Sequence, residues 1–190
     1  CGTCADFCPR IDHVENRPDL VNYDPLCCLG FTYCPRTFLD MAAMESKLFG
    51  RTRKEDEPLG IYRKAVAAQA QPALAAAQDG GVATALLVEA MQSGMIDCAI
   101  VTGRDEQWQT QTLIATSPEE IRSAAGTKYT IHNSVMAVKD ALEMGYKKIG
   151  FVGTPCQIQG LRKVKLLDEP YQFGQDKIAL LLGLFFMDNF

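Results

Sequence analysis

Apolar and polar positions follow different patterns on the two sides of residue 60. Before it, apolar residues are scattered among cysteines and charged residues; after it, they recur with helical and strand periods. Residues 82–92 carry apolar side chains at helical spacing and are followed by Gly94, a common helix stop. Residues 95–102 and 113–116 are short apolar runs typical of buried strands, near enough in sequence to pair antiparallel. In the helix predicted at 82–92, the side chains expected to face the core are Val82, Leu86, Leu87, Ala90 and Met91.

The same reading predicts the other elements of an α/β domain over residues 60–190. Ser117, Pro118 and Glu120 mark a helix start, with a capping serine, proline at the first helical position and glutamate at the third. Further predicted elements are a strand at 61–70 whose alanines also permit a helix, a helix from Asn133 or Ser134 to Met144, a strand at 148–153, a helix at 158–164 and a strand at 178–185. We therefore expect a mixed sheet with flanking helices.

The region before residue 60 divides into two parts. A short amphipathic helix from residue 37 to 48 ends near Gly50, and the charged run at 51–58 has the composition of a solvated linker. The predicted organisation is a cysteine-rich segment at 1–40, a linker with a helix at 41–59 and the α/β domain at 60–190. The chain begins at a cysteine and ends on an apolar residue, so we expect a fragment that continues at both ends.

Composition narrows the classes of function. With 190 residues and 47% hydrophobic content the chain can bury a real core. The net charge of −4 and pI near 5.2 argue against a nucleic-acid surface, which needs clustered lysine and arginine. The apolar run at 178–187 is interrupted by Gly183 and is too short for a bilayer span. We expect a cytoplasmic protein without a membrane span.

Two glycine-bearing corners of the α/β domain have the chemistry of a cofactor site. Gly80 and Gly81 precede the first helix, where positive φ and free backbone N–H groups suit a phosphorylated cofactor. At Gly126, a hydroxyl, a cation and an aromatic ring follow within three residues. An ordinary helix end with polar surface residues explains the second corner equally well.

A third corner lies after the strand predicted at 148–153. Gly153 is followed by Pro155 and Cys156, which open a helix, so the helix dipole favours the thiolate of Cys156. A metal ligand or redox thiol fits this position, with a small buried residue as the alternative. Cys98, inside a predicted strand, is interpreted as core, and His13, His132 and Trp108 receive no role.

Six of the eight cysteines lie in the first 34 residues, which indicates metal or redox chemistry. Cys1, Cys4, Cys8 and the proline after them give Cys-x2-Cys-x3-Cys-Pro. This is the last three-quarters of the bacterial ferredoxin run Cys-x2-Cys-x2-Cys-x3-Cys-Pro and not the paired spacing of a zinc finger. The predicted segment is ferredoxin-like and binds [4Fe-4S] rather than zinc, with the first cysteine of the run just before Cys1.

A second run, ending at Cys34, is degenerate. The ferredoxin template expects cysteine at 24, 27 and 30, and the chain has Asp24, Cys27 and Gly30, with Cys28 as an extra. In two-cluster ferredoxins the fourth cysteine of each run serves the other cluster. One cluster would therefore use Cys34 with Cys1, Cys4 and the missing cysteine. The other would have Cys8 and Cys27 with help from Cys28 or Asp24, and is altered or absent.

Taken together, these motifs resemble the family of beta subunits of coenzyme F420-reducing hydrogenases and dehydrogenases. The resemblance covers nearly the whole chain and rests on residues 78–84, 125–130, 155–163 and 187–190, in this order and at this spacing. One departure is that relatives often carry cysteine just before the 187–190 ending, where this chain has Phe186. If that cysteine is a ligand in them, the nearby cluster here is rebuilt or lost.

The resemblance implies an FAD-binding α/β domain, one or more [4Fe-4S] clusters and, in many members, an N-terminal ferredoxin-like extension. Members move electrons between clusters and a deazaflavin coenzyme, a ferredoxin or a pigment. The expected partners are coenzyme F420 or ferredoxin, with hydrogenase or dehydrogenase subunits. By resemblance Cys156 ligates a cluster near the flavin, and the residues expected to line the flavin are Gly80, Gly81, Thr84, Gly126, Thr127, Lys128 and Tyr129.

The sequence leaves three classes of function open. The first is an iron–sulfur flavoprotein oxidoreductase, whose chemistry comes from its cofactors and for which no catalytic acid or base is assigned. The second is a non-catalytic electron-transfer subunit that holds clusters and docks a hydrogenase or dehydrogenase. Beside it stands the alternative that the chain is a ferredoxin-dependent reductase of another substrate. The third is a zinc-stabilised interaction module on an unrelated α/β domain.

Overall fold

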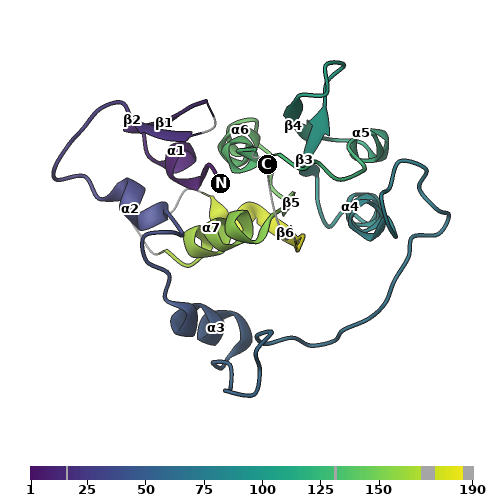
Figure 1. The fold of residues 1–190 in the computed structure, drawn as a ribbon, viewed down its shortest axis with the longest axis horizontal. Helices are drawn as coiled ribbons and strands as arrows, with labels where there is room; N and C mark the ends of the chain where they lie inside the picture. Colours follow the sequence, from purple (N-terminus) through teal and green to yellow (C-terminus); the bar gives the residue numbers. More distant parts are fainter. Residues whose placement is uncertain (16, 131, 168–173, 186–190) are drawn as a thin grey trace.

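The structure is a computed structural model that describes residues 1–15, 17–130, 132–167 and 174–185. Most helices and strands form a layered body, and residues 40–81, with α3 and a long loop, extend away from it before the chain returns at α4 (Figure 1). In chain order the elements are α1 (Thr3–Phe7), β1 (Ile11–Val14), β2 (Arg17–Leu20), α2 (Leu29–Tyr33), α3 (Met41–Phe49), α4 (Val82–Gln92), β3 (Cys98–Arg104), β4 (Thr110–Ala115), α5 (Pro118–Ser123), η1 (Ser134–Met136), α6 (Ala137–Glu143), β5 (Ile149–Gly153), α7 (Pro155–Lys165), η2 (Gln175–Lys177) and β6 (Ile178–Gly183).

The larger sheet has the strand order β4-β3-β5-β6. β3, β5 and β6 are parallel, whereas β4 pairs antiparallel with β3. Ile100 in the middle of β3 lies opposite Ile114 of β4 and Phe151 of β5. Only the short connection 105–109 separates β3 from β4, which permits a hairpin, while the parallel pairs need helical crossovers. The predicted mixed α/β sheet is confirmed.

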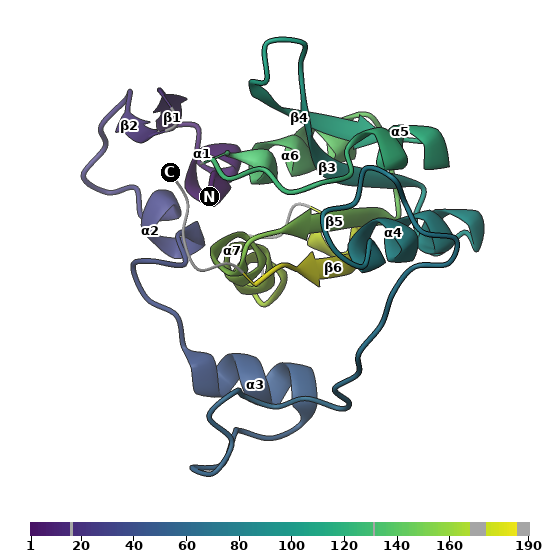
Figure 2. The same ribbon diagram turned by 45° about the vertical axis from the view of Figure 1, so that its right-hand side comes forward.

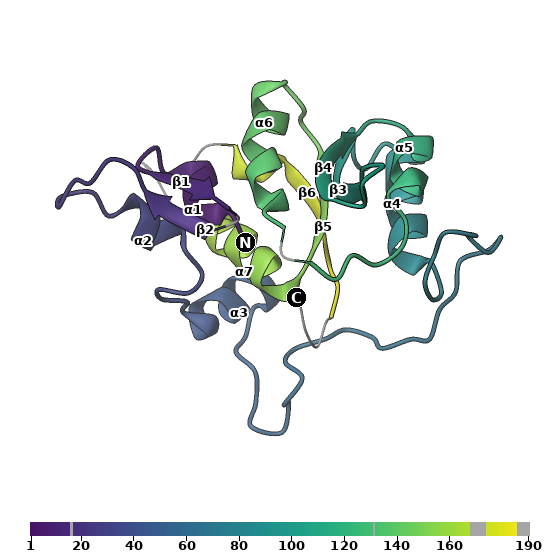
Figure 3. The same cartoon turned by 45° about the horizontal axis from the view of Figure 1, so that its top comes forward.

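Helices cover both faces of this sheet (Figure 3). Cys98 and Ile100 of β3 enter a core with α6 and α7, and Ala99 and Val101 enter a second core with α4 and α5. All four are at most 3% exposed, because successive side chains of a strand point to opposite faces. The continuous apolar run in β3 is therefore the pattern of a strand buried on both sides, and Cys98 is core as predicted.

The cysteine-rich segment forms a small unit from α1, α2 and the β1–β2 hairpin, packed beside α7 (Figure 2). α1 contacts α2, α6 and α7. The rings of Phe7 and Tyr33 lie 5.6 Å apart between α1 and α2, and Phe7 also packs against the core under the sheet. The unit therefore shares its packing with the α/β domain.

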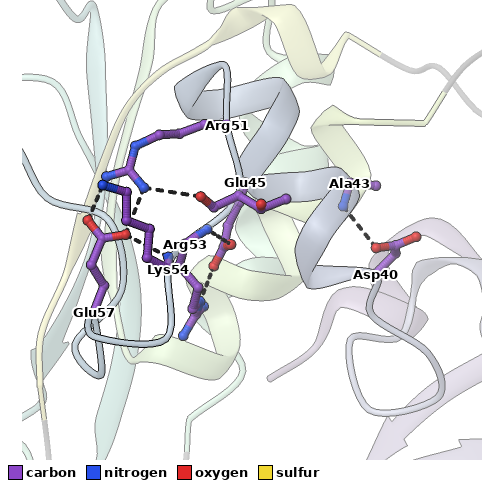
Figure 4. Close-up of polar contacts among 8 residues, drawn as sticks. Asp40, Ala43, Glu45, Arg51, Arg53, Lys54 and Glu57 are labelled. Atoms are coloured by element: carbon purple, nitrogen blue, oxygen red, sulfur yellow. Dashed lines mark hydrogen bonds and ion pairs between the residues drawn. The ribbon is translucent and has the colours of Figure 1, made fainter.

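The charged run after α3 is more organised than a solvated linker. Asp40 caps α3 by accepting from Ala43 N at 2.8 Å, and the run then folds back on the helix (Figure 4). Glu45 is 5% exposed and pairs with the Arg53 guanidinium, while accepting from Arg53 N at 2.8 Å. Arg51 holds both carboxylate oxygens of Glu57, at 2.6 and 2.7 Å. Residues 51–57 thus form an ion-paired loop.

Two predictions about the elements are wrong. Residues 61–70 form neither a strand nor a helix. Their alanines give no alternation of apolar and polar positions, and most of their side chains are exposed. On α4, Leu86 is 49% exposed and Val88 takes the buried place predicted for it.

Several predicted boundaries shift by a few residues. α7 begins at Pro155 rather than 158, and β6 ends at Gly183 rather than 185. β6 contains much of the apolar run at 178–187 and pairs with β5 in the sheet. Phe186 and the family-like ending at 187–190 lie outside the described residues. In the part of the chain that the structure describes, no helix has both the length and the apolar character to cross a bilayer.

Candidate functional site

The first predicted corner, residues 78–81, is a tight turn at the start of α4. Gly81 has φ +66°, and no described side chain caps the helix start. The first N–H groups of an uncapped helix are donors for an anion, and the helix dipole adds to that attraction. Gly80 serves the protein itself: Ala70 N donates to Gly80 O at 2.7 Å, and a Cβ on Gly80 would lie 2.9 Å from Ala68 O. Thr84 is half-buried in the first turn of α4.

The second predicted corner, residues 126–129, lies against the first. Gly126 has φ +88°, and a Cβ there would be 3.0 Å from Ala76 O. The Gln78 side-chain amide donates to the Tyr129 hydroxyl at 2.8 Å. Two glycine turns some 50 residues apart in sequence are thus joined by a backbone contact and by a hydrogen bond. Thr127 and Tyr129 remain exposed there.

Two cations lie at the second corner. Lys128 Nζ donates to the carbonyls of Ala124, Ala125 and Gly126, beyond the end of α5. Burial, and secondarily the charge of Arg104, lowers the pKa of Lys128 to about 8. Arg104, the last residue of β3, donates to Thr127 O. The ammonium of Lys128 therefore holds the loop after α5, which agrees with the interpretation of this corner as an ordinary helix end. It also adds positive charge beside the turn at Gly126.

The third predicted corner, at the start of α7, is connected to the second through residues 132–134. The Gln157 amide donates to His132 O at 2.9 Å and to Ser134 Oγ at 3.0 Å, and its oxygen accepts from Thr154 N at 2.9 Å. Cys156, in the first turn of α7, is half-buried with its sulfur 3.3 Å from Thr154 Oγ1. Residues 124–130 and 132–134 thus connect the turn before α4 with the helix that carries Cys156.

The cysteine-rich segment meets the same region. A Cβ on Gly2 would lie 3.1 Å from Met136 Cγ and 3.2 Å from Asn133 O, and one on Gly160 of α7 would overlap the Thr3 hydroxyl. Lys163 of α7 donates to Cys34 O at 2.8 Å. The absence of a side chain at residue 160 allows α1 to pack closely on α7, and its absence at residue 2 allows residues 133–136 to approach the start of the chain.

Cys4 and Cys34, predicted to share a cluster, belong to two helices in contact: Cys4 lies in α1, and Cys34 directly follows α2. Burial and, to a smaller extent, the charge of Cys34 raise the pKa of the Cys4 thiol. Cys1 Sγ lies 3.4 Å from Thr3 Oγ1, on the same short helix. Among the described residues, no group of three or more His, Cys, Asp or Glu side chains is arranged to hold a single metal ion. A cluster differs from an ion because its ligands bind separate irons and stand farther apart.

The remaining cysteines of the segment are arranged differently. Cys8 is 2% exposed, Cys27 is half-buried and Cys28 is exposed at the start of α2. The position at 30, where the ferredoxin template expects cysteine, is Gly30 within α2. Cys34 thus lies at α7 through Lys163, and Cys8 lies beside Gly30 and close to β1.

Several contacts of the site were not predicted from sequence. His132 lies between β4 hydroxyls, with Nε2 2.6 Å from Thr112 Oγ1, and Arg104 lies 4.6 Å from the Trp108 ring centre. Arg104 had one usable signal, since it is a cation at the carboxyl end of a buried strand, where α/β proteins bind ligands. Gln157 had the local signal of a capping box with Thr154. Its bonds to residues 132 and 134, and those of Lys163 to residues 31 and 34, had no signal because these partners lie 23 to 132 residues away.

A separate pocket lies between α1 and α6, and part of its wall comes from the residues between and beside Cys4 and Cys8. Asp6, 5% exposed, is on its wall, and burial followed by the charge of Asp140 raises the pKa of this carboxyl to about 8. None of the residues predicted to bind a cofactor lines it. The lining residues are Ala5, Asp6, Phe7, Pro9, Lys139, Leu142, Glu143, Gly174 and Lys177.

Comparisons with known proteins identify the α/β domain. Residues 65–139 match the family described as coenzyme F420 hydrogenase/dehydrogenase, beta subunit N-term, and residues 146–190 match the corresponding C terminus family. The coenzyme F420 hydrogenase subunit beta of Methanosarcina barkeri is 41% identical over 140 residues, 72% of this chain and 48% of that protein. A subunit of the F(420)H(2) dehydrogenase of Methanosarcina mazei is 35% identical over 207 residues, which cover all of this chain and 53% of that protein.

A solved structure gives the same answer. A chain of the F420-reducing [NiFe] hydrogenase complex from Methanosarcina barkeri matches with a TM-score of 0.58 and 41% identity, over 62% of this chain and 41% of that chain. The chain thus spans about half the length of the relatives it matches, or less. The match to the Methanosarcina mazei protein includes the cysteine-rich segment. The chain belongs to the family of coenzyme F420 hydrogenase/dehydrogenase beta subunits.

Proposed function

We propose that this chain is the FAD- and [4Fe-4S]-binding part of an oxidoreductase subunit that exchanges electrons between the cysteine-rich segment and coenzyme F420. One observation carries the proposal. Residues 124–130 and 132–134 contact the turn before α4, the start of α7 and the N-terminal segment. Electron transfer needs its cofactors close together, and this stretch contacts the three segments proposed to bind them. Partner subunits of a hydrogenase or dehydrogenase belong to the same proposal, as in the relatives' names.

The residues at the two glycine corners suit the anionic part of FAD. The uncapped start of α4 offers backbone donors, and Arg104 and Lys128 add positive charge at the neighbouring corner. A Cβ on Gly81 or on Gly126 would meet residues of the loop before α4, so these glycines let that loop pack against the two turns. In the proposal, the backbone N–H groups at the start of α4 bind the cofactor, and the Gln78–Tyr129 hydrogen bond fixes the distance between the corners. Thr84 and Thr127 supply hydroxyls beside them.

FAD, when bound, accepts a hydride from a reduced deazaflavin and releases single electrons. The chain's own residues hold it, shield it and keep it next to the path of the electrons. For the cysteine-rich segment we propose Cys1, Cys4 and Cys34 as ligands of one [4Fe-4S] cluster, carried by α1, α2 and the residues that flank them; both helices contact α7. Cys156 is proposed as a ligand of a second centre nearer the flavin, because its helix start is tied to residues 132–134.

Anaerobic purification of the complete protein tests this proposal. We expect bound FAD, iron and acid-labile sulfide, and bleaching of the flavin absorbance when reduced coenzyme F420 is added. Flavin that bleaches with dithionite but not with reduced F420 would indicate a docking and electron-transfer subunit without its own F420 site. A preparation without flavin and without iron would overturn the proposal.

A further inference from the structure

The cysteine-rich segment brings together two pairs of positions of the ferredoxin template. Each pair takes one position from the first cysteine run and one from the second. Cys4 lies in α1 and Cys34 directly follows α2, and these two helices contact each other. Cys8, directly after α1, lies 4.0 Å from the point where a Cβ on Gly30 would stand. These are the pairs expected when the fourth cysteine of each run serves the other cluster. One pair has two thiols, and the other has a thiol and a glycine.

The space beside Gly30 is already filled. A Cβ at residue 30 would overlap Cδ1 of Ile11, the first residue of β1. The Ile11 side chain therefore occupies the volume that a cysteine side chain at 30 would need. Cys8 beside it is 2% exposed, which is typical of a small buried residue in an apolar contact.

Asp24, at the first template position of the degenerate run, has structural partners of its own. The Asp24 carboxylate lies 2.8 Å from the Arg10 guanidinium and accepts from Leu26 N at 2.9 Å. Arg10 also donates to Asn22 O at 3.4 Å. Asp24 thus closes the turn before α2 and neutralises Arg10. Of the four template positions, one is a paired carboxylate, one is a glycine with its space taken, and two are cysteines.

We infer that the cysteine-rich segment holds one [4Fe-4S] cluster, on the Cys1–Cys4–Cys34 side, and that its second ferredoxin site is replaced by a plug. The plug is the Ile11 side chain over Gly30 together with the Arg10–Asp24 ion pair. The inference rests on the proposed iron–sulfur function of the segment. The retained site is the one next to α7, where Lys163 donates to Cys34 O. Electrons therefore pass through this segment by a single cluster, and Cys8 and Cys27 are not ligands.

Four single variants of the complete protein, purified anaerobically, test the inference through iron and sulfide content. Cys4→Ala and Cys34→Ala remove proposed ligands, and each should lose about four iron atoms per chain relative to the unmodified protein. Cys8→Ala and Cys27→Ala remove cysteines of the plugged site and should keep all of the iron, with an unchanged electron paramagnetic resonance spectrum after reduction. Because Cys8 is buried, Cys27→Ala decides the question if Cys8→Ala does not fold.

The outcomes separate the inference from the proposed function. A loss of about four iron atoms in Cys27→Ala or in folded Cys8→Ala shows a second cluster and overturns the inference while the iron–sulfur function stands. Unchanged iron in both Cys4→Ala and Cys34→Ala overturns the proposed role of the segment. Loss of iron in Cys4→Ala and Cys34→Ala, with retention in Cys8→Ala and Cys27→Ala, supports a single cluster beside α7.

Discussion

Gly160 of α7 packs directly against Thr3 of α1. A Cβ on residue 160 would overlap the Thr3 hydroxyl oxygen and lie 3.2 Å from Thr3 Cβ. Thr3 is fully buried, and Cys1 and Cys4 are its near neighbours in sequence. The helix that begins at Pro155 and carries Cys156 is therefore also the wall on which the cysteine-rich segment sits.

Substituting Gly160 by alanine should loosen this contact. The added methyl group forces α1 away from α7, and overpacking of this kind costs about 1–3 kcal/mol of unfolding free energy. Chemical denaturation of the complete protein measures the change. Thr3→Ala in the same chain removes the overlapping hydroxyl and should restore part of the loss. If the double variant is no more stable than Gly160→Ala alone, the two residues do not oppose each other in this way.

Gln157→Glu tests the connection between the second and third corners. A carboxylate cannot donate, so His132 O and Ser134 Oγ lose the donor that they share. We expect a loss of about 1–3 kcal/mol in unfolding free energy, together with weaker flavin retention because residues 126–130 precede this contact. Gln111→Glu, at an exposed position on β4, is the matched control. Equal effects of the two variants would contradict the proposed connection.

The pH dependence of flavin retention should report on Lys128. Its pKa is lowered from 10.5 to about 8, first by burial and then by Arg104. The ammonium is therefore lost from the folded protein as pH rises through about 8, and retention of an anionic cofactor should weaken above that pH.

Folding stability should change in the opposite direction over the same range. The unfolded chain keeps this proton until about 10.5, so the Lys128 contribution to unfolding free energy rises between pH 8 and 10.5. Lys128→Met should flatten both profiles, whereas Lys147→Met, at an exposed position before β5, should leave them unchanged. Flavin retention that is the same at pH 7 and pH 9 in the unmodified protein would argue against a role for the Lys128 charge.

Lys163 should raise the reduction potential of the cluster in the cysteine-rich segment. Its ammonium donates to Cys34 O at 2.8 Å, on the backbone of a proposed cluster ligand. Burial lowers the pKa of Lys163, and the neighbouring Cys34 partly opposes this. Hydrogen bonds and positive charge near cluster sulfurs favour the reduced state. Redox titration followed by electron paramagnetic resonance should therefore give a more negative potential for Lys163→Met. An identical potential in Lys163→Met and in the control Lys147→Met, at an exposed position before β5, would refute this.

The sequence pattern predicted much of the fold because local chemistry decides it. Ser117 accepts from Glu120 N as the predicted cap, and α5 begins at Pro118. Alternation along β3 sends neighbouring residues to opposite faces, as a buried parallel strand requires. Residues 61–70 were mistaken for a strand because their alanines and isolated apolar residues fit several patterns, and only the shape of the loop around Gly80 fixes them.

The site was less predictable because its contacts join residues far apart in sequence. The glycine turns at 81 and 126 were recognised from composition, and their positive φ values agree with the need for glycine. Gly80 was expected to face a ligand, yet its missing side chain leaves room for Ala68 O. Lys163 and Gln157 act across α7 on segments that no local motif connects to them. The three corners were predicted, whereas the contacts that join them had to be seen in the structure.

The central claim is that the turn before α4 holds a flavin. Gly81 and Gly94, at the two ends of α4, have nearly the same strained backbone, with φ +66° and +70°. Alanine at either position carries a similar backbone cost, and only residue 81 lies at the proposed flavin site. A Cβ at 81 would also lie 3.2 Å from Ala77 Cβ and from Leu74 Cδ1, whereas 94 is open, so the unfolding free energy of both variants is measured beside their flavin content. Bound flavin per chain, measured after heat release from anaerobically purified protein, should fall about tenfold in Gly81→Ala and stay unchanged in Gly94→Ala. Equal flavin content in both variants would contradict the claim.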